Sequence, residues 1–92
     1  MELTELDLAI LVTILLKGGK SKTAHFPEEF VCRCFPTHQQ GAVKKRLKAL
    51  RRGGYLSIKP HPSGASYGLS DEGWNVAKGL EADARSCRAE AV

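Results

Sequence analysis

Lysine and arginine dominate the middle of this 92-residue chain. Eight basic residues and no Asp or Glu lie between Phe30 and Ser70, and six of the eight fall within residues 44–52. The formal charge of the whole chain is only +4, because most of its acids lie near the two ends. Clustered cations bind phosphate groups and release counterions from them. The chemistry that this segment supports is therefore the binding of a polyanion.

The basic segment also has the spacing of a helix. Val43, Leu47 and Leu50 recur at i, i+4 and i+7, which places them on one apolar face. Four cations point away from that face at 100° per residue: Lys44, Lys45, Lys48 and Arg52. Thr37 and Gln40 predict a capping box at the helix start. Such a helix suits the major groove of DNA, where cations bind phosphates and amides bind base edges.

The chain before this segment predicts a first helix and a connector. Thr4 is a suitable cap for the first helix, and Gly18 and Gly19 end it. Residues 6–16 are almost entirely apolar, so this helix must be covered on all sides. Residues 20–26 are polar and partly β-prone, which suits a connector or a short strand.

A second, short helix is expected between the connector and the basic segment. Pro27 fits its first turn, and it reaches about Cys34, with Phe30, Val31 and Cys34 available to the core. A Phe-Pro pair ends it, and a turn of about three residues leads to the basic helix. Helix, tight turn and basic helix is the spacing of a helix-turn-helix motif.

The chain after residue 53 predicts a hairpin and a last helix. Residues 55–59 and 66–69 have the composition of strands, and turn-forming residues fill 61–65. Ser70 then caps a helix with acidic first residues, as suits a helix N-terminus. Tyr67 and Trp74 are expected in the core or an interface. The expected apolar stripe of the last helix is Val76, Ala77, Leu80, Ala84 and Cys87.

The order of these elements resembles that of winged helix-turn-helix DNA-binding transcription regulators. The segment AVKKRLKALRRGGYL (42–56) resembles their recognition helix running into the first wing strand, and YGLSDEG (67–73) resembles their exit from the wing. The resemblance implies a mainly α fold with a small β-hairpin (α+β), in which a three-helix core carries a wing and a C-terminal helix. It implies a single domain over residues 1–92, with a recognition helix at 37–53, a wing hairpin at 54–69 and a C-terminal helix at 70–88.

The resemblance also assigns residues to DNA. The expected contacts of the recognition helix are Thr37, His38, Gln39, Gln40, Gly41, Lys44, Lys45, Lys48, Arg51 and Arg52. Helix capping alone is the alternative role for Gln39 and Gln40. Gly41 lies on the exposed face, where it lets the helix approach closely although it lowers helix propensity by about 1 kcal/mol.

The wing is expected to add Lys59, His61 and Ser63 as backbone or minor-groove contacts. Its tip, PSGA at 62–65, departs from the arginine-tipped wings that are commoner in the family. This wing is therefore expected to read less sequence.

Two cysteines and two histidines surround the expected turn: His25, Cys32, Cys34 and His38. Thiolates and imidazoles bind zinc or copper(I), and some metal-sensing winged-helix repressors carry a Cys-x-Cys pair near this place. Here no Asp follows the pair, and residues i and i+2 of a helix point about 200° apart. We therefore expect no metal site, with one cysteine buried and the other exposed.

Size and composition exclude several classes of protein. Ninety-two residues suit one domain with a modest core and no cleft between two lobes. No catalytic triad, carboxylate pair or phosphate loop is present, so we expect neither an enzyme nor a cofactor. Apolar runs stay short of a membrane span and lack a cleavage site. Three cysteines, an odd number, indicate a reduced, cytoplasmic setting.

Double-stranded DNA and a second copy of the chain are the expected partners. The first helix is apolar on every side, and the last helix offers small residues beyond Leu80, so we expect a homodimer through these two helices. A protein–protein interaction module with an acidic partner and an RNA-binding module are the alternatives for the basic face. The amides among the cations of residues 39–48 favour DNA, whose bases must be read.

Overall fold

The computed structural model describes residues 2–19, 21, 24–61 and 64–91, and it describes side chains up to Glu81 except that of His61. The elements follow in the order α1 (Glu5–Lys17), β1 (His25–Pro27), α2 (Glu28–Arg33), α3 (Thr37–Arg52), β2 (Leu56–His61), β3 (Gly64–Leu69) and α4 (Asp71–Ala91). Within the described residues this is a mixed α+β fold of four helices and one three-stranded antiparallel sheet.

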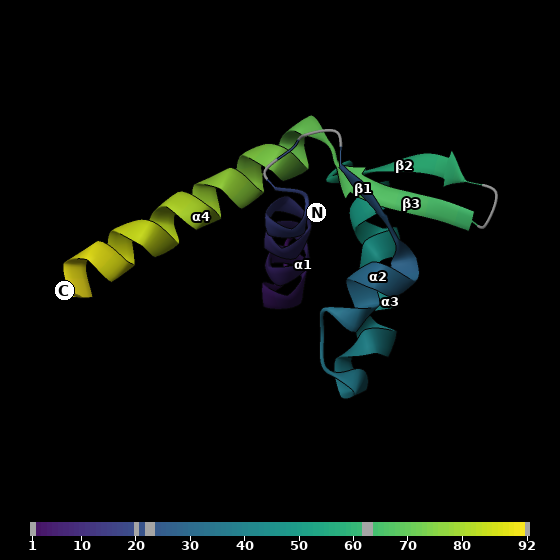
Figure 1. Cartoon of the computed structure of the whole chain (residues 1–92), viewed down its shortest axis with the longest axis horizontal. Coiled ribbons are helices and arrows are strands. Elements are labelled where there is room, and N and C mark those ends of the chain that lie inside the picture. The colour runs from purple at the N-terminus through teal and green to yellow at the C-terminus, as the bar shows by residue number, and fades with distance from the viewer. Residues whose placement is uncertain (1, 20, 22–23, 62–63, 92) are drawn as a thin grey trace.

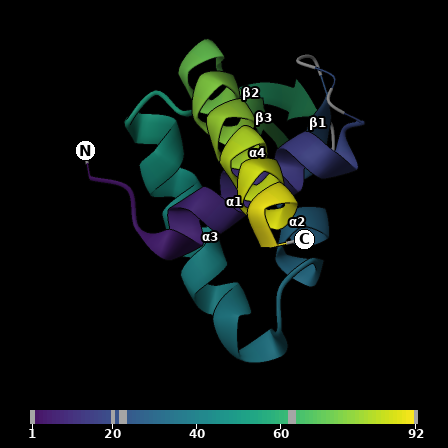
Figure 2. The same cartoon turned by 90° about the vertical axis from the view of Figure 1, so that its left-hand side faces the viewer.

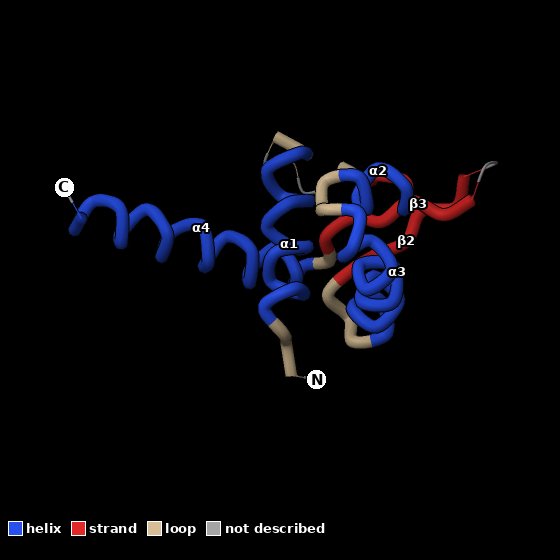
Figure 3. Tube along the Cα trace, turned by 90° about the horizontal axis from the view of Figure 1, so that it is seen from below, coloured by secondary structure: helices blue, strands red, loops and turns tan. Residues whose placement is uncertain are grey.

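Helix α1 lies between two layers of the molecule. Helix α4 packs across one side of α1, while α2, α3 and the sheet lie on its other side (Figures 1 and 2). The C-terminal half of α4 extends past the body at one end, and the β2–β3 hairpin projects at the opposite end (Figure 3). The molecule is therefore elongated, with extents of 47 × 29 × 25 Å.

The local sequence sets the helix ends. Thr4 caps α1 through a reciprocal pair: its Oγ1 accepts from the Asp7 N–H at 3.1 Å, and the Asp7 carboxylate accepts from the Thr4 N–H at 2.9 Å. Ser70 caps α4 by accepting a bond of 3.2 Å from the Gly73 N–H. Gly53 ends α3. The starts predicted at Thr4 and Ser70 and the end predicted at Gly53 are confirmed.

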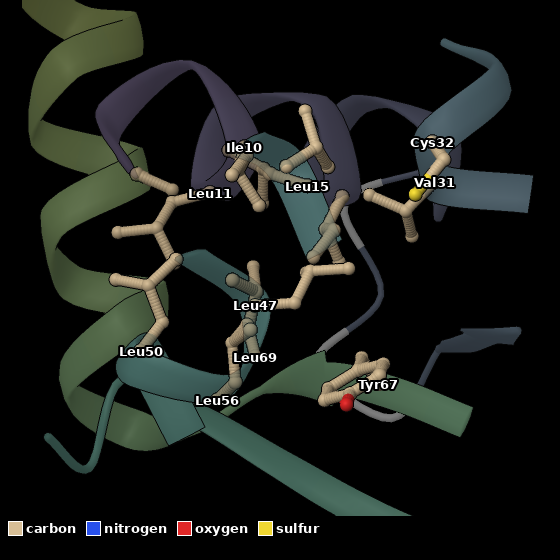
Figure 4. Close-up of a cluster of buried hydrophobic side chains, with 13 residues drawn as sticks. Ile10, Leu11, Leu15, Val31, Cys32, Leu47, Leu50, Leu56, Tyr67 and Leu69 are labelled. Carbon is tan, nitrogen blue, oxygen red and sulfur yellow. The ribbon is translucent and has the colours of Figure 1, made fainter. Parts of the chain in front are cut away.

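Apolar side chains from all four helices and the β2–β3 hairpin form one core (Figure 4). Its buried helical members are Ile10, Leu11, Ile14, Leu15, Val31, Cys32, Val43, Leu47, Leu50 and Ala77. Leu56, Tyr67 and Leu69 complete the core from the strands. The prediction that Tyr67 belongs to the core is confirmed, and its burial raises the pKa of its hydroxyl.

A single chain buries one face of α1. The side chains of this face are fully or almost fully buried in the core: Ile10, Leu11, Ile14 and Leu15. Among the described residues, the exposed large hydrophobic side chains are Leu16, at 53% exposure, and Phe30, at 39%. Leu6, Leu8 and Val12 stay only partly buried although α4, α3 and the sheet all pack on α1. The single chain therefore does not cover α1 on every side.

The connector contributes a third strand to the sheet. Strand β1 pairs with β3, which also pairs with β2, so the strand order is β1-β3-β2. His25 and Ser57 lie on either side of Gly68 in this register, and His25 Nε2 lies 3.1 Å from Ser57 Oγ. A Cβ atom at Gly68 would lie 2.7 Å from the His25 ring. Glycine at this position therefore lets His25 cross the central strand and join the two outer ones.

The second helix differs from its prediction. Pro27 ends β1 and precedes α2 as its N-cap, so the helix begins one residue later than expected. Val31 and Cys32 are buried, whereas Cys34 is exposed and Phe30 stacks on Phe26 with ring centroids 4.9 Å apart. The expectation that Phe30 and Cys34 supply the core is therefore wrong, because only the α2 face that meets α3 is buried.

The last three elements are longer than their predictions. Strand β2 continues to His61 and β3 already begins at Gly64, so both strands are longer toward the hairpin turn than predicted. Helix α4 continues to Ala91 rather than 88. Trp74 is half-buried against the core, as predicted, and Lys78 Nζ lies 5.7 Å from the centroid of its ring. The predicted stripe residues Ala84 and Cys87 have side chains outside the described part of the structure.

Candidate nucleic-acid interface

The outward face of α3 carries a row of exposed polar and basic residues. Val43, Leu47 and Leu50 are buried completely, which fixes the direction of the core. At 100° per residue, the positions opposite this direction form what we call the outer stripe: His38, Gly41, Lys45, Lys48 and Arg52. All five are exposed. The cations of the outer stripe can therefore reach an anionic surface without unfolding any part of the core.

Part of the outer stripe borders an open hollow. Lys45, Lys48, Ala49, Arg52 and Gly53 line it. Three of these five residues are cations, and Asp and Glu are absent from residues 31–69. Ala49 adds little bulk between them, which leaves room for a phosphate group to approach three positive charges.

Two further cations lie on one flank of α3. Lys44 is close enough to the Cys32 thiol to affect its pKa, and Arg51 has the same relation to Tyr67. Both cations are exposed. Lys44 therefore faces the α2 side, and Arg51 faces the sheet. Together with the outer stripe they give α3 a basic front that spans about half of its circumference.

The predicted capping box at the start of α3 is wrong. Pro36 is the N-cap, and no side chain caps this end, so Thr37 is the first helical residue and is exposed. Gln40 Nε2 instead donates to the Phe35 carbonyl oxygen at 3.3 Å. Gln40 and Gln39 are half-buried, so they lie beside the outer stripe rather than within it. A proline before the helix removes the N–H that a capping box needs from its first residue.

An ion pair missed by the sequence analysis joins α1 to α3. Arg46 Nε and Nη2 donate to Asp7 Oδ1 and Oδ2 at 2.6 and 2.7 Å. Asp7 is completely buried, and the Arg46 side chain is 31% exposed. Burial raises the pKa of Asp7, but the bonds from Arg46 and Thr4 outweigh it and leave the pKa below its ordinary value. The sequence did hold a signal for this pair: Asp7 is the one acid among the apolar residues 6–16. A carboxylate buried among apolar side chains needs a cation as partner.

The ion pair also changes the character of the basic segment. Arg46 is occupied by Asp7, and the bond raises the pKa of its guanidinium. It lies on the α1 side of α3, away from the outer stripe. Five of the six cations in residues 44–52 therefore remain for an external anion.

The wing residues are placed only in part. Lys59 is exposed on β2, where it pairs with Ser66 of β3. His61 ends β2, but its side chain lies outside the described part of the structure, as does all of Ser63. The wing therefore contributes one exposed cation that is described, at its edge strand.

The cysteines near the turn have separate environments. Cys32 is buried, and burial followed by the charge of Glu28 raises the pKa of its thiol. Cys34 is exposed and lies 3.4 Å from the Phe30 carbonyl oxygen. The expectation of one buried and one exposed cysteine is confirmed. His25 contacts Ser57, and within the described residues no group of three or more His, Cys, Asp or Glu side chains could hold a metal ion.

Solved structures of other proteins share the fold of this chain. The crystal structure of AF1382 from Archaeoglobus fulgidus matches 92% of this chain and 90% of that one, with a TM-score of 0.73 and 14% sequence identity. A protein from Thermoplasma volcanium, described as a possible HxlR family transcriptional factor, matches with a TM-score of 0.71 and 14% identity. That match covers 96% of this chain and 75% of the other. The likeness establishes a winged-helix fold for this chain.

Sequence comparison adds nothing to this likeness, since no protein-family model and no curated protein sequence matches the chain. Among the described helices, none has both the length and the apolar content to span a membrane.

Proposed function

We propose that this protein is a winged-helix transcription regulator that binds double-stranded DNA by seating α3 in the major groove. The observation that carries the proposal is the outer stripe, which presents three cations and an exposed glycine opposite the buried face of α3. The fold of the possible transcriptional factor from Thermoplasma volcanium supports the same function. A regulator of this kind acts as a binding protein in the cytoplasm, not as an enzyme.

The proposed contacts divide by their position on α3. His38, Lys45 and Lys48 of the outer stripe face base edges, and Lys can donate to guanine O6 or N7. Lys44, Arg51 and Arg52 lie toward the flank or the end of the helix, where phosphates pass. Thr37, Gln39 and Gln40 support the first turn of α3, with backbone N–H groups near the duplex. Lys59, His61 and Ser63 of the wing are proposed to contact the sugar-phosphate backbone.

We further propose that the regulator is a homodimer that pairs through α1 and α4. Leu16 is exposed at the end of α1, and the C-terminal half of α4 runs past the body of the molecule (Figure 3). A helical segment of about ten residues has little stability alone in water. A second copy that covers it would bury on the order of 1,200–2,000 Å² in total.

Two substitutions on α3 test the proposed DNA contacts. Arg52→Ala removes a proposed phosphate contact, so affinity falls for every duplex and the slope of log K against log salt decreases by about 0.9. Lys45→Ala removes a proposed base contact, so it costs about 1–3 kcal/mol on a duplex selected from a random pool and little on random DNA. Arg33→Ala is the matched control, because it removes an exposed cation of α2 that lies outside the proposed DNA contacts and the proposed dimer interface, so it should leave both quantities unchanged.

Binding is measured by fluorescence anisotropy over a range of salt concentrations, with circular dichroism to confirm folding. If all three folded variants bind duplex DNA as the parent does, the basic front of α3 is a solvated surface and the protein–protein alternative leads. If single-stranded RNA competes as well as duplex DNA, the RNA-binding alternative leads.

A further inference from the structure

The Asp7–Arg46 ion pair connects the first turn of α1 to the middle of α3. Arg46 donates to the Asp7 carboxylate through Nε and Nη2, one bond to each oxygen. The Thr4 N–H also donates to Asp7 Oδ2 at 2.9 Å. Asp7 lies in the first helical turn, where the helix dipole favours a negative charge. The carboxylate is therefore held from three directions and has little freedom to move.

Stability alone does not account for a pair of this kind. Replacing a buried ion pair with apolar side chains of similar volume often leaves stability unchanged or raises it. The remaining contribution of the pair is geometric, because a two-pronged bond between guanidinium and carboxylate fixes both distance and orientation. Apolar contacts such as those of Leu47 and Leu50 lack this directionality.

The orientation of α3 about its own axis decides where the outer stripe points. Side chains reach about 5–6 Å from a helix axis, so a rotation of about 20° moves their ends by about 2 Å. Hydrogen bonds to base edges tolerate only about 0.5 Å in length. Phosphate contacts by flexible lysines fall off more gently with distance, because charge attraction has a longer range. A loosely oriented α3 would therefore still bind DNA but would read its sequence poorly.

We propose that Asp7 and Arg46 are positioning residues that hold α3 in the rotation at which the outer stripe discriminates between base pairs. This inference rests on the proposed DNA-binding function and names residues that set its specificity. Neither residue contacts DNA in this scheme. Arg46 acts through the placement of its neighbours Lys45 and Lys48, and Asp7 acts through Arg46.

Arg46→Lys tests the geometry while it keeps the charge. Lysine retains the cation but lacks the planar fork, and the 31% exposure of the Arg46 side chain leaves room for its ammonium group. The expected result is a drop of about tenfold in the ratio of affinities for a selected duplex and a random duplex. Affinity for random duplex and its salt slope stay at the parent's values, because the net charge is the same.

Asp7→Asn is expected to raise the affinity for random DNA, which Arg46→Lys leaves unchanged. Without the carboxylate, Arg46 is free to turn toward solvent and adds a cation that nothing neutralises. Affinity for random duplex therefore rises and the salt slope steepens by up to about 0.9, while the ratio of selected to random affinity falls. If the pair only stabilised the fold, the added cation would raise both affinities alike and leave their ratio at the parent's value.

The double variant Asp7→Leu with Arg46→Leu keeps the test valid if a single variant fails to fold by circular dichroism. It replaces the ion pair with apolar packing, so the expected protein is folded and has a low affinity ratio. A folded variant of any of the three that keeps the parent's ratio overturns the positioning role. A parent that binds duplex DNA with no sequence preference overturns sequence reading itself, which is a failure of the proposed function and is seen before any variant is made.

Discussion

Gly41 lies on the outer stripe of α3, and a Cβ atom added there would meet nothing within 4 Å. Alanine is favoured over glycine inside a helix by about 1 kcal/mol. Gly41→Ala is therefore expected to raise the midpoint of thermal unfolding by about 4–8 °C. If the stripe enters the major groove closely, the added methyl group must displace its surroundings at a cost of about 1–3 kcal/mol. Affinity for the selected duplex then falls by about tenfold, which fluorescence anisotropy measures.

Gly79 provides the matched control for this substitution. It is an exposed glycine in α4, and an added Cβ there also meets nothing within 4 Å. Gly79→Ala should give the same gain in thermal stability with no loss of DNA affinity. If Gly41→Ala also leaves affinity unchanged, α3 does not approach the duplex at this position.

Individual residues show which features of the structure could be predicted from the sequence and which could not. The helical spacing of Val43, Leu47 and Leu50 was sufficient to orient α3 correctly, because a buried face leaves a periodic pattern. The role of Arg46 was not predictable from this pattern, since its partner lies 39 residues away on another helix. The same limit applies to Gln40, whose bond to the Phe35 carbonyl depends on how the turn before α3 folds.

At the level of elements, the helices with strong end signals were predicted well and the short elements were not. The caps at Thr4 and Ser70 mark the starts of α1 and α4. Strand β1 has only three residues, and its structure depends on the pairing with β3. Because that pairing joins residues more than 35 positions apart, local composition could indicate a short strand but not its place in the sheet.

The junction between α1 and α3 makes a prediction about pH. The pKa of Asp7 in the folded protein lies below its ordinary value of 3.8. The ion pair therefore contributes its full stabilisation above pH 4, and this is lost as the pH falls through the lower, folded pKa. Asp7→Asn should lower the unfolding midpoint at pH 7 on the order of 5 °C, and the difference from the parent should shrink between pH 4 and 2.

Glu5→Gln is the control for this pH dependence, because Glu5 is an exposed acid in the same first turn of α1. Its unfolding midpoint should follow that of the parent closely over the whole range. Calorimetry at several pH values measures both variants. A difference between the parent and Asp7→Asn that stays constant from pH 7 to 2 would show that the carboxylate's charge does not stabilise the junction.

At the level of the whole molecule, the layers separate two proposed tasks. Helix α3 lies on one side of α1, and α4 lies on the other (Figures 1 and 3). Helix α1 contacts both layers, and Asp7 joins it to α3. A pairing of two copies through α1 and α4 would therefore leave both outer stripes free and connect them through α1.

The homodimer proposal is tested most directly at Leu16, which is 53% exposed in one chain. A glutamate there would be tolerated by a monomer but would place a charge in an apolar interface, which costs several kcal/mol when unpaired. Light scattering at tens of micromolar should therefore give a dimer for the parent and a monomer for Leu16→Glu. Phe30→Glu changes another exposed large hydrophobic residue, which lies on α2, and should remain dimeric.

DNA binding gives an independent measure of the same assembly. Two recognition helices in a symmetric dimer contact half-sites about 34 Å apart, one turn of the duplex. A duplex selected by the parent should therefore have dyad symmetry, and Leu16→Glu should bind a single half-site as tightly as the whole site. A monomeric parent that selects an asymmetric duplex would contradict the homodimer proposal.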